Sequence, residues 1–251
     1  MKKEKIYIST VAEGAADCAK QYGLGLEIAE YCTAYNMDDF FPETDKIVQE
    51  YLRSSDRFVL HAPFNELYPS AIDPRAVELA HERLSQAVRL AGDYGVHRIV
   101  MHSGFIPQIY YKIWFEERSI LFWKDFLKNQ PEDVLICLEN VWEDEAELLC
   151  RIVEAVDDPR FRLCLDTGHA ACYSKVPLQQ WVKTCAPHLA HFHVHNNAGD
   201  SDTHNDLNRG IIEMEDVLRL AGELCPEATF TLETLQSYPS VEWLAERGLM
   251  E

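Results

Sequence analysis

The sequence predicts an α/β protein, a single-domain (β/α)8 TIM barrel over residues 1–251, and three observations support this. Short apolar runs recur roughly every thirty residues with helical patterns between them. There are eight such runs, and the chain length of 251 residues suits eight strand and helix units. Because each parallel pairing needs a crossover, the alternation favours a parallel sheet. A doubly wound open sheet is the alternative, but no glycine-rich phosphate turn follows the first run.

The eight apolar runs are the predicted strands. They cover residues 6–10, 25–31, 58–63, 98–104, 134–140, 161–169, 189–196 and 229–235. The longest irregular stretches follow Pro63 and Asn196. We interpret both as loops that carry an active site, because binding residues are commonly placed on loops held by a rigid scaffold.

Helical patterns fill the intervals between the runs. The clearest helix is predicted to begin at Asp73, an N-cap residue followed by Pro74 at the first helical position, and to end between Gly92 and Gly95. Further helices are predicted over residues 41–54, 110–128, 143–156, 178–185, 214–224 and 241–247.

Composition limits the classes of partner. With 23 Lys and Arg against 42 Asp and Glu, the formal charge of −19 argues against nucleic acid and anionic membranes as partners. The first residues carry no apolar signal segment, and no run is long enough to span a bilayer. The eight cysteines include no C-x-x-C pair, which predicts buried, reduced thiols. We therefore expect a cytoplasmic protein; the oligomeric state, including a homo-oligomer, stays open.

Side chains that bind metals or move protons come late in six consecutive runs. They are His61, His102, Glu139, Asp166 with His169, His193 with Asp202 and His204 from its loop, and Glu233. Small or β-branched residues stand two positions before five of them, as the interior of a barrel requires: Val59, Val100, Cys137, Cys164 and Thr231. One such strand-end residue is usually only solvated, but six strands with the same feature predict a metal site at the rim, where barrel enzymes place their chemistry.

The number of these residues bears on the metal content. Zinc takes four or five ligands and manganese about six, so nine side chains cannot all bind one ion. Either two or three ions bind, or some of the nine contact substrate. The mixture of imidazoles and carboxylates suits Zn, Mn, Fe or Co.

The run at residues 189–196 alternates apolar and polar residues, so His191, His193 and His195 share one face. His191 lies deeper and is predicted to be a hydrogen-bonded interior residue. His195 lies beyond His193 and is predicted to contact substrate. Glu27, late in the second run, is assigned a structural role, although it could also face the mouth of the barrel. An edge strand with solvated histidines is the alternative.

Other residues are candidates for substrate binding. Arg209 could contact a phosphate or hydroxyl group, although a solvated loop arginine explains it equally well. Trp142 could wall a pocket against the apolar face of a sugar, and Phe64, Phe105 and Trp114 could do the same. Core packing explains any one of these four equally well.

Seven short motifs occur in a recognisable order. They are HAP (61–63), HSG (102–104), LENVW (138–142), LDTGH (165–169), HVHNN (193–197), DTH (202–204) and LET (232–234). Together they resemble the xylose isomerase-like TIM-barrel superfamily, which holds sugar isomerases and epimerases together with endonuclease IV. The resemblance covers nearly the whole chain.

The resemblance implies two sets of roles. In the ketose 3-epimerases one Mn or similar ion is held at positions matching Glu139, Asp166, His193 and Glu233. The two glutamates are the catalytic acid and base, which act through an enediolate that the metal stabilises. In endonuclease IV three zinc ions use nine ligands, and all nine matching positions are filled here. Two departures exist: HSG stands where the endonuclease has HPG, and Asn196 replaces an aspartate.

We therefore predict a divalent-metal-dependent isomerase or epimerase that acts on a small-molecule sugar or sugar phosphate. Nucleic acid is not the expected partner, because the loops carry few basic residues. The alternatives are a polynuclear zinc phosphoesterase and a non-catalytic barrel that binds metal.

Overall fold

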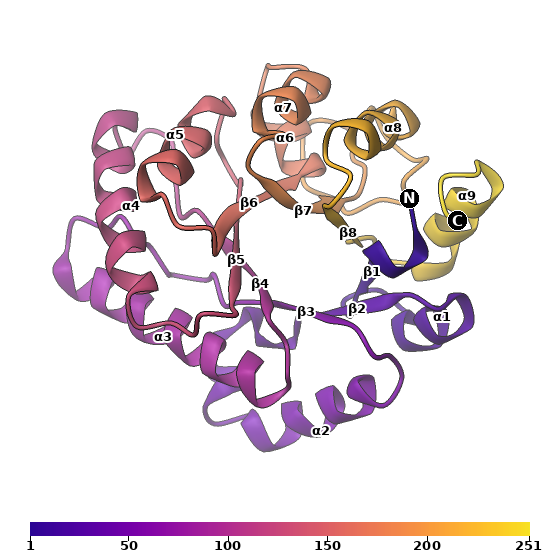
Figure 1. Ribbon diagram of the computed structural model, residues 1–251, viewed down its shortest axis with the longest axis horizontal. Helices are drawn as coiled ribbons and strands as arrows, with labels where there is room; N and C mark the ends of the chain where they lie inside the picture. The colour runs from indigo at the N-terminus through magenta and orange to yellow at the C-terminus, as the bar shows by residue number, and fades with distance from the viewer.

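Eight parallel strands pair in sequence order and close into a barrel, β8 against β1, in the computed structural model, which describes residues 1–251 (Figure 1). The strands are β1 Ile6–Ser9, β2 Gly25–Ile28, β3 Phe58–His61, β4 Arg98–His102, β5 Leu135–Glu139, β6 Phe161–Asp166, β7 Leu189–Val194 and β8 Thr229–Leu232. All eight predicted strands exist, and the predicted (β/α)8 fold class is confirmed.

Nine α-helices surround the barrel (Figure 1). They are α1 Ala15–Tyr22, α2 Phe41–Leu52, α3 Pro74–Asp93, α4 Lys112–Leu127, α5 Glu147–Val156, α6 Thr167–Tyr173, α7 Leu178–Cys185, α8 Met214–Leu224 and α9 Ser237–Glu246. Short 3-10 helices span Lys3–Lys5, Glu30–Cys32 and Ala34–Met37. The predicted start of α3 is confirmed, because Asp73 Oδ1 accepts a hydrogen bond from the Arg75 amide at 2.9 Å.

The structure differs from the sequence prediction at four elements. Helix α5 begins at Glu147, four residues after the predicted start. Helix α1 was not predicted. Helix α9 begins at Ser237, four residues before the predicted range. The run at residues 161–169 is not one strand, because its Asp166 side chain accepts a hydrogen bond from the His169 amide at 2.6 Å and thereby caps the N-terminus of α6. His169 therefore lies on a helix rather than on a strand.

The apolar core has two parts. A cluster of 63 buried residues packs the outer faces of the strands against the helices. A smaller cluster fills the inside of the barrel and holds Tyr7, Val59, Val100, Cys137 and Cys164, four of which the strand alternation predicts. At Gly25 a Cβ atom would lie 2.3 Å from the Tyr7 ring, so this ring occupies the space that a side chain on β2 would need. The interior below the rim is therefore packed.

The cysteines agree with the sequence prediction of reduced thiols. All eight are free, and six of them are buried. None of the helices is both long and apolar enough to cross a membrane.

Candidate metal centre

The nine side chains predicted as metal ligands form one connected group at the C-terminal rim of the barrel. Glu139 lies at its centre: Oε2 is 3.3 Å from His61 Nε2, 3.5 Å from His102 Nε2 and 3.4 Å from His193 Nδ1. The Nδ1 atom of His193 is also 3.9 Å from Asp166 Oδ2 and 3.5 Å from Glu233 Oε2. Residues far apart in the sequence thus converge as predicted.

The loops after β6 and β7 complete the group. His169 Nε2 lies 3.2 Å from Asp202 Oδ2, and His204 Nε2 lies 3.0 Å from the same oxygen. His204 has a positive φ of 48°, a left-handed conformation that non-glycine residues rarely adopt. Such backbone conformations cluster at functional sites, where the surrounding structure holds them in place.

The separations around Glu139 suit ligands of a shared ion better than direct hydrogen bonds. Protein N–H···O hydrogen bonds are mostly about 2.7–3.2 Å long. Two ligands that are each about 2.0–2.1 Å from a tetrahedral zinc ion are roughly 3.3 Å apart. The Glu139 Oε2 distances to His61, His102 and His193 are 3.3, 3.5 and 3.4 Å. The spacing is therefore that of donor atoms around a cation.

Buried polar atoms without partners point to the same conclusion. Glu139 Oε2, His193 Nδ1 and Asp202 Oδ1 are buried and have no hydrogen-bond partner. Buried polar groups are nearly always satisfied, and each exception needs an explanation such as an ion. All three atoms belong to predicted ligands, so a divalent cation fits these residues.

Three histidines are oriented by main-chain carbonyls. The Nδ1 atoms of His61, His169 and His204 contact the carbonyl oxygens of Ala62, Asn140 and Glu233 at 2.9, 2.9 and 2.7 Å. If Nδ1 carries the proton and donates it there, Nε2 is left as the free acceptor. In His61 and His204 this Nε2 atom lies next to Glu139 and Asp202, so the carbonyl contact prepares each ring for metal binding. In His169 the Nε2 atom lies next to Asp202, while Nδ1 also lies 3.3 Å from Glu139 Oε1.

His193 is oriented by a side chain instead. Its Nε2 lies 2.9 Å from Oε1 of Glu27, a completely buried carboxylate on β2. Nδ1 is thereby left to face Glu139, Asp166 and Glu233. The structural role predicted for Glu27 thus consists of a contact to a candidate metal ligand, which its position late in β2 did not reveal.

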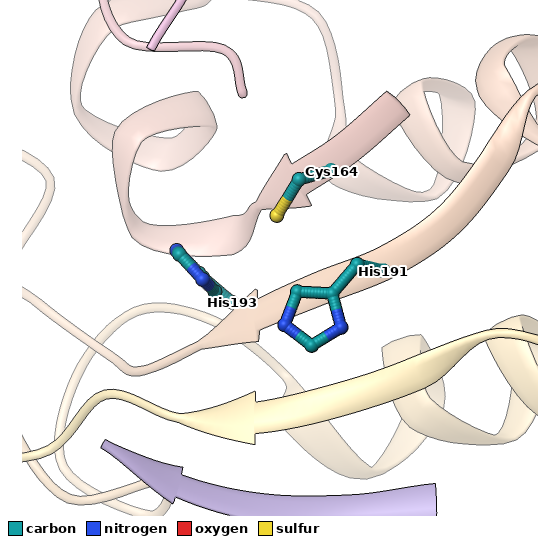
Figure 2. A group of neighbouring side chains, drawn as sticks. All are labelled: Cys164, His191 and His193. Atoms are coloured by element: carbon teal, nitrogen blue, oxygen red, sulfur yellow. The ribbon is translucent and has the colours of Figure 1, made fainter. Parts of the chain in front are cut away.

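Figure 2 shows Cys164, His191 and His193, whose potential ligand atoms lie within 4.8 Å of one another. Burial raises the pKa of the Cys164 thiol well above its usual value, so the thiol is neutral. His191 uses both nitrogens: Nδ1 is 2.6 Å from Thr229 Oγ1 and Nε2 is 2.9 Å from Thr231 Oγ1. Burial lowers the His191 pKa to about 4. His191 is therefore the predicted hydrogen-bonded interior residue. Cys164 and His191 offer no free ligand atom, and the free Nδ1 of His193 faces Glu139 instead.

Glu139 and His102 are in the ionisation state that binds a metal, whereas the pKa values of His61, His169 and His193 are raised well above the usual value and that of His204 to about 9, against the effect of burial, so without an ion these four rings hold protons. Burial alone would raise the pKa of the Glu139 carboxyl, but the His193 imidazole outweighs it and holds that pKa well below its ordinary value. Burial lowers the pKa of His102 to about 3, against the effect of the Glu139 carboxylate. Since metals bind carboxylates and neutral imidazoles, both side chains are in the form that binds.

His195 lies beneath the cavity rather than on its wall. It is fully buried and does not line the cavity. Its Nε2 lies 3.1 Å from Asp166 Oδ2, and its ring stacks on His204 with centroids 4.0 Å apart. A Cβ atom on Gly168 would come within 1.9 Å of the His195 ring. The glycine of the LDTGH motif thus leaves room for this ring, which contacts the candidate metal ligands Asp166 and His204.

A cavity of about 600 Å³ opens above the group. His61, His102, Glu139, His169, Asp202, His204 and Glu233 form its polar floor. Trp142, Phe64 and Phe105 line it as predicted, whereas Trp114 does not. Arg209 does not line it either, because its side chain is 75 % exposed and pairs with Asp206 at 3.3 Å. The structure thus places Arg209 at the surface, apart from this cavity, as the solvated alternative describes.

Asn196, one departure from the endonuclease motif, fixes the loop after β7. Its Oδ1 accepts a hydrogen bond from the Ile212 amide at 3.0 Å, and its Nδ2 donates to the carbonyls of Leu207 at 2.9 Å and Ile212 at 3.0 Å. An aspartate carboxylate could not make these donations. The amide here positions the loop that carries Asp202 and His204 without being a ligand.

Comparisons with known proteins agree with this geometry. A family model described as "xylose isomerase-like TIM barrel" matches residues 18–247. The probable endonuclease 4 of Mycoplasma mobile is 23 % identical over 207 residues, which cover 74 % of this chain and 69 % of that protein.

Two solved structures share the fold. A D-tagatose 3-epimerase-like protein superposes with a TM-score of 0.78 at 21 % identity, over 96 % of each chain. The TTHB071 protein from Thermus thermophilus, studied after soaking with ZnCl2, superposes with a TM-score of 0.77 at 24 % identity, over 96 % of this chain and 97 % of that one.

Proposed function

This chain belongs to the xylose isomerase-like TIM-barrel family, and from that premise we propose that it is a divalent-metal-dependent isomerase or epimerase of a sugar. One observation carries the proposal. His193 Nδ1 lies 3.4 Å from Glu139, 3.9 Å from Asp166 and 3.5 Å from Glu233, so three carboxylates gather around this one nitrogen, and two of them line the cavity. The epimerase-like protein of similar fold supports a sugar as substrate.

The proposed chemistry is a proton transfer beside a carbonyl group. A divalent cation, Zn or Mn by the type of ligand, supplies Lewis-acid polarisation of that carbonyl when bound. Glu139 and Glu233 both line the cavity and have acceptor oxygens at its floor. One carboxylate takes the proton from the carbon next to the carbonyl, and the other returns a proton to that carbon or to its neighbour.

Deuterium exchange tests this proposal. The metal-loaded protein is incubated in D2O with a panel of ketoses, and deuterium on the carbon next to the carbonyl is measured by NMR. We expect incorporation with at least one sugar and a loss of at least about 100-fold in Glu139→Gln and in Glu233→Gln. Glu154→Gln, on the outer side of α5, is the matched control and should match the wild type. No incorporation by fully loaded protein would contradict the proposal and favour a non-catalytic barrel.

A polynuclear zinc phosphoesterase is the second candidate, because the candidate ligands divide into several groups. His61, His102 and Glu139 form one, and His195, His204 and Glu233 form another. The relative named probable endonuclease 4 points the same way. Against it, no lysine or arginine lines the cavity to hold a phosphodiester. Metal analysis separates the two: one ion per chain fits the isomerase, and two or three zinc ions fit the hydrolase.

The free cysteines also support the predicted cytoplasmic location, since reduced thiols are typical of that compartment.

A further inference from the structure

We propose that the substrate of this site carries an uncharged, apolar substituent on the side away from the metal, and that it carries no phosphate. The inference rests on the proposed function, because it assumes that the polar end of the substrate lies against the candidate metal ligands. It concerns the opposite end, which the walls and the mouth of the cavity must hold.

The mouth of the cavity is formed by exposed apolar side chains. Val11, Trp142, Tyr173 and Leu235 all line the cavity, and they are 54, 38, 39 and 58 % exposed. They follow four different strands, β1, β5, β6 and β8. A single exposed apolar residue needs no explanation, but several around one opening indicate a binding surface.

The apolar surface continues from the mouth down to the candidate ligands. The Phe64 ring, from the loop after β3, stacks on the His102 ring with centroids 4.2 Å apart and planes inclined by 14°. Phe105, from the loop after β4, is buried beside the same cavity. A molecule that reaches Glu139 therefore passes along aromatic rings, against which the apolar part of a ligand can pack.

The charge on the walls argues against a phosphate. Besides Glu139, Asp202 and Glu233 at the floor, the cavity wall carries the acidic Glu66 and no lysine or arginine. The candidate cation Arg209 points into solvent and pairs with Asp206. A phosphate away from the metal would lose its hydration and meet carboxylates without a compensating cation, which is unfavourable.

The size of the cavity agrees with a ligand that has two parts. Its volume of about 600 Å³ lies within the range of pockets that enclose drug-sized ligands. The polar floor suits the hydroxyl and carbonyl oxygens of a sugar. The apolar walls and mouth suit an aromatic or aliphatic group attached to it.

Hydroxamic acids test the inference without knowledge of the substrate, because their two oxygens chelate a divalent ion while the tail varies. Acetohydroxamic, phenylacetohydroxamic and phosphonoacetohydroxamic acid are titrated into the metal-loaded protein by calorimetry. We expect the phenyl compound to bind at least about tenfold more tightly than the acetyl compound, since its ring buries apolar area. The phosphono compound should bind no more tightly than the acetyl compound.

Substitutions at the mouth of the cavity test whether the phenyl group binds there. Trp142→Ser and Leu235→Asn should remove most of the advantage of the phenyl compound and leave the affinity for acetohydroxamic acid unchanged. Ile47→Asn replaces an apolar residue on α2 that is 47 % exposed, a value between those of Trp142 and Leu235, and does not line the cavity; it should change neither affinity. Leu235→Lys should raise the affinity for the phosphono compound severalfold, because it supplies the missing cation.

The outcomes separate this inference from the proposed function. If the protein binds no metal in a prior titration, the proposed function fails. If metal binds but the three hydroxamic acids bind equally, or the phosphono compound binds most tightly, or none binds, the inference about the substituent is overturned. It is also overturned if the mouth variants shift the affinity of all three compounds alike.

Discussion

Glu27 and His193 face each other inside the barrel, with Glu27 Oε1 2.9 Å from His193 Nε2 and both side chains fully buried. The carboxylate thereby fixes which nitrogen of the imidazole points at Glu139, Asp166 and Glu233. Carboxylates that hold a metal-binding histidine in this way also increase the basicity of the ring as a ligand. The contact links the packed interior to the candidate metal centre.

We expect Glu27→Gln to weaken binding of Zn or Mn by about 10–100-fold, because a neutral amide holds the His193 ring less firmly and makes it less basic. The dissociation constant is measured by competition with a chromophoric chelator. Glu154→Gln serves as the matched exposed control. An unchanged metal affinity in Glu27→Gln would show that the 2.9 Å contact has no role in metal binding.

The double variant Asp202→Asn and His204→Gln tests the number of ions. His193 contacts Glu139, Asp166 and Glu233 without these two residues. We therefore expect the double variant to keep one ion per chain and to retain deuterium exchange within about tenfold. The measurements are elemental analysis and NMR. Loss of one or two zinc ions together with activity would favour the polynuclear hydrolase.

Glu143 provides a test of pH-dependent stability. Burial raises the pKa of its carboxyl to about 6, although Ser103 and the Val141 amide donate hydrogen bonds to it. Between the unfolded pKa, about 4.3, and pH 6 the native state binds more protons than the unfolded state, so this group's contribution to stability falls as pH rises. The stabilising contribution of Glu143 is fully present below about pH 4.3 and is lost as the pH rises through about 6.

Urea unfolding of the wild type and of Glu143→Gln at pH 4.5 and pH 7 measures this contribution. We expect the stability of the wild type relative to the variant to fall by about 2 kcal/mol between the two pH values. Chelator in all samples removes the linkage of metal binding to pH. A relative stability that stays constant or rises with pH would contradict the raised pKa.

Gly168→Ala is expected to destabilise the protein by about 3 kcal/mol or more, because the new Cβ atom would lie 1.9 Å from the buried His195 ring. Thermal unfolding measures the effect, and metal affinity should fall with it as His195 and Asp166 move. Gly222→Ala is the matched control within α8, where a Cβ atom meets nothing within 4 Å. This variant should stabilise by about 1 kcal/mol, so equal effects of the two substitutions would contradict the steric argument.

The floor of the site could be predicted from sequence for a physical reason. In a barrel of parallel strands the last residues of all strands meet at one rim, so His61, His102 and Glu139 converge whatever path the loops take. The same alternation predicts the interior layer below them, which contains Val59 and Val100. Strand periodicity carries this information because side chains repeat every two residues.

The rest depends on contacts between distant segments, which local sequence does not encode. Arg209 follows the DTH loop closely, but its pairing with Asp206 turns it away from the cavity. His195 lies one strand repeat beyond His193, yet the loops cover it completely. The role of Glu27 depends on a contact from β2 across the barrel interior to β7, 166 residues away in the sequence.

The main-chain contacts of His61, His169 and His204 have a consequence for how this site can change over generations of mutation. An amino-acid replacement alters a side chain but leaves the peptide carbonyl in place. Point mutations therefore rarely change which nitrogen of these three rings carries the proton. His193 is different, because its support is a replaceable carboxylate. Position 27 is therefore where natural variation or laboratory selection could adjust the affinity of the centre for its ion while leaving every candidate ligand intact.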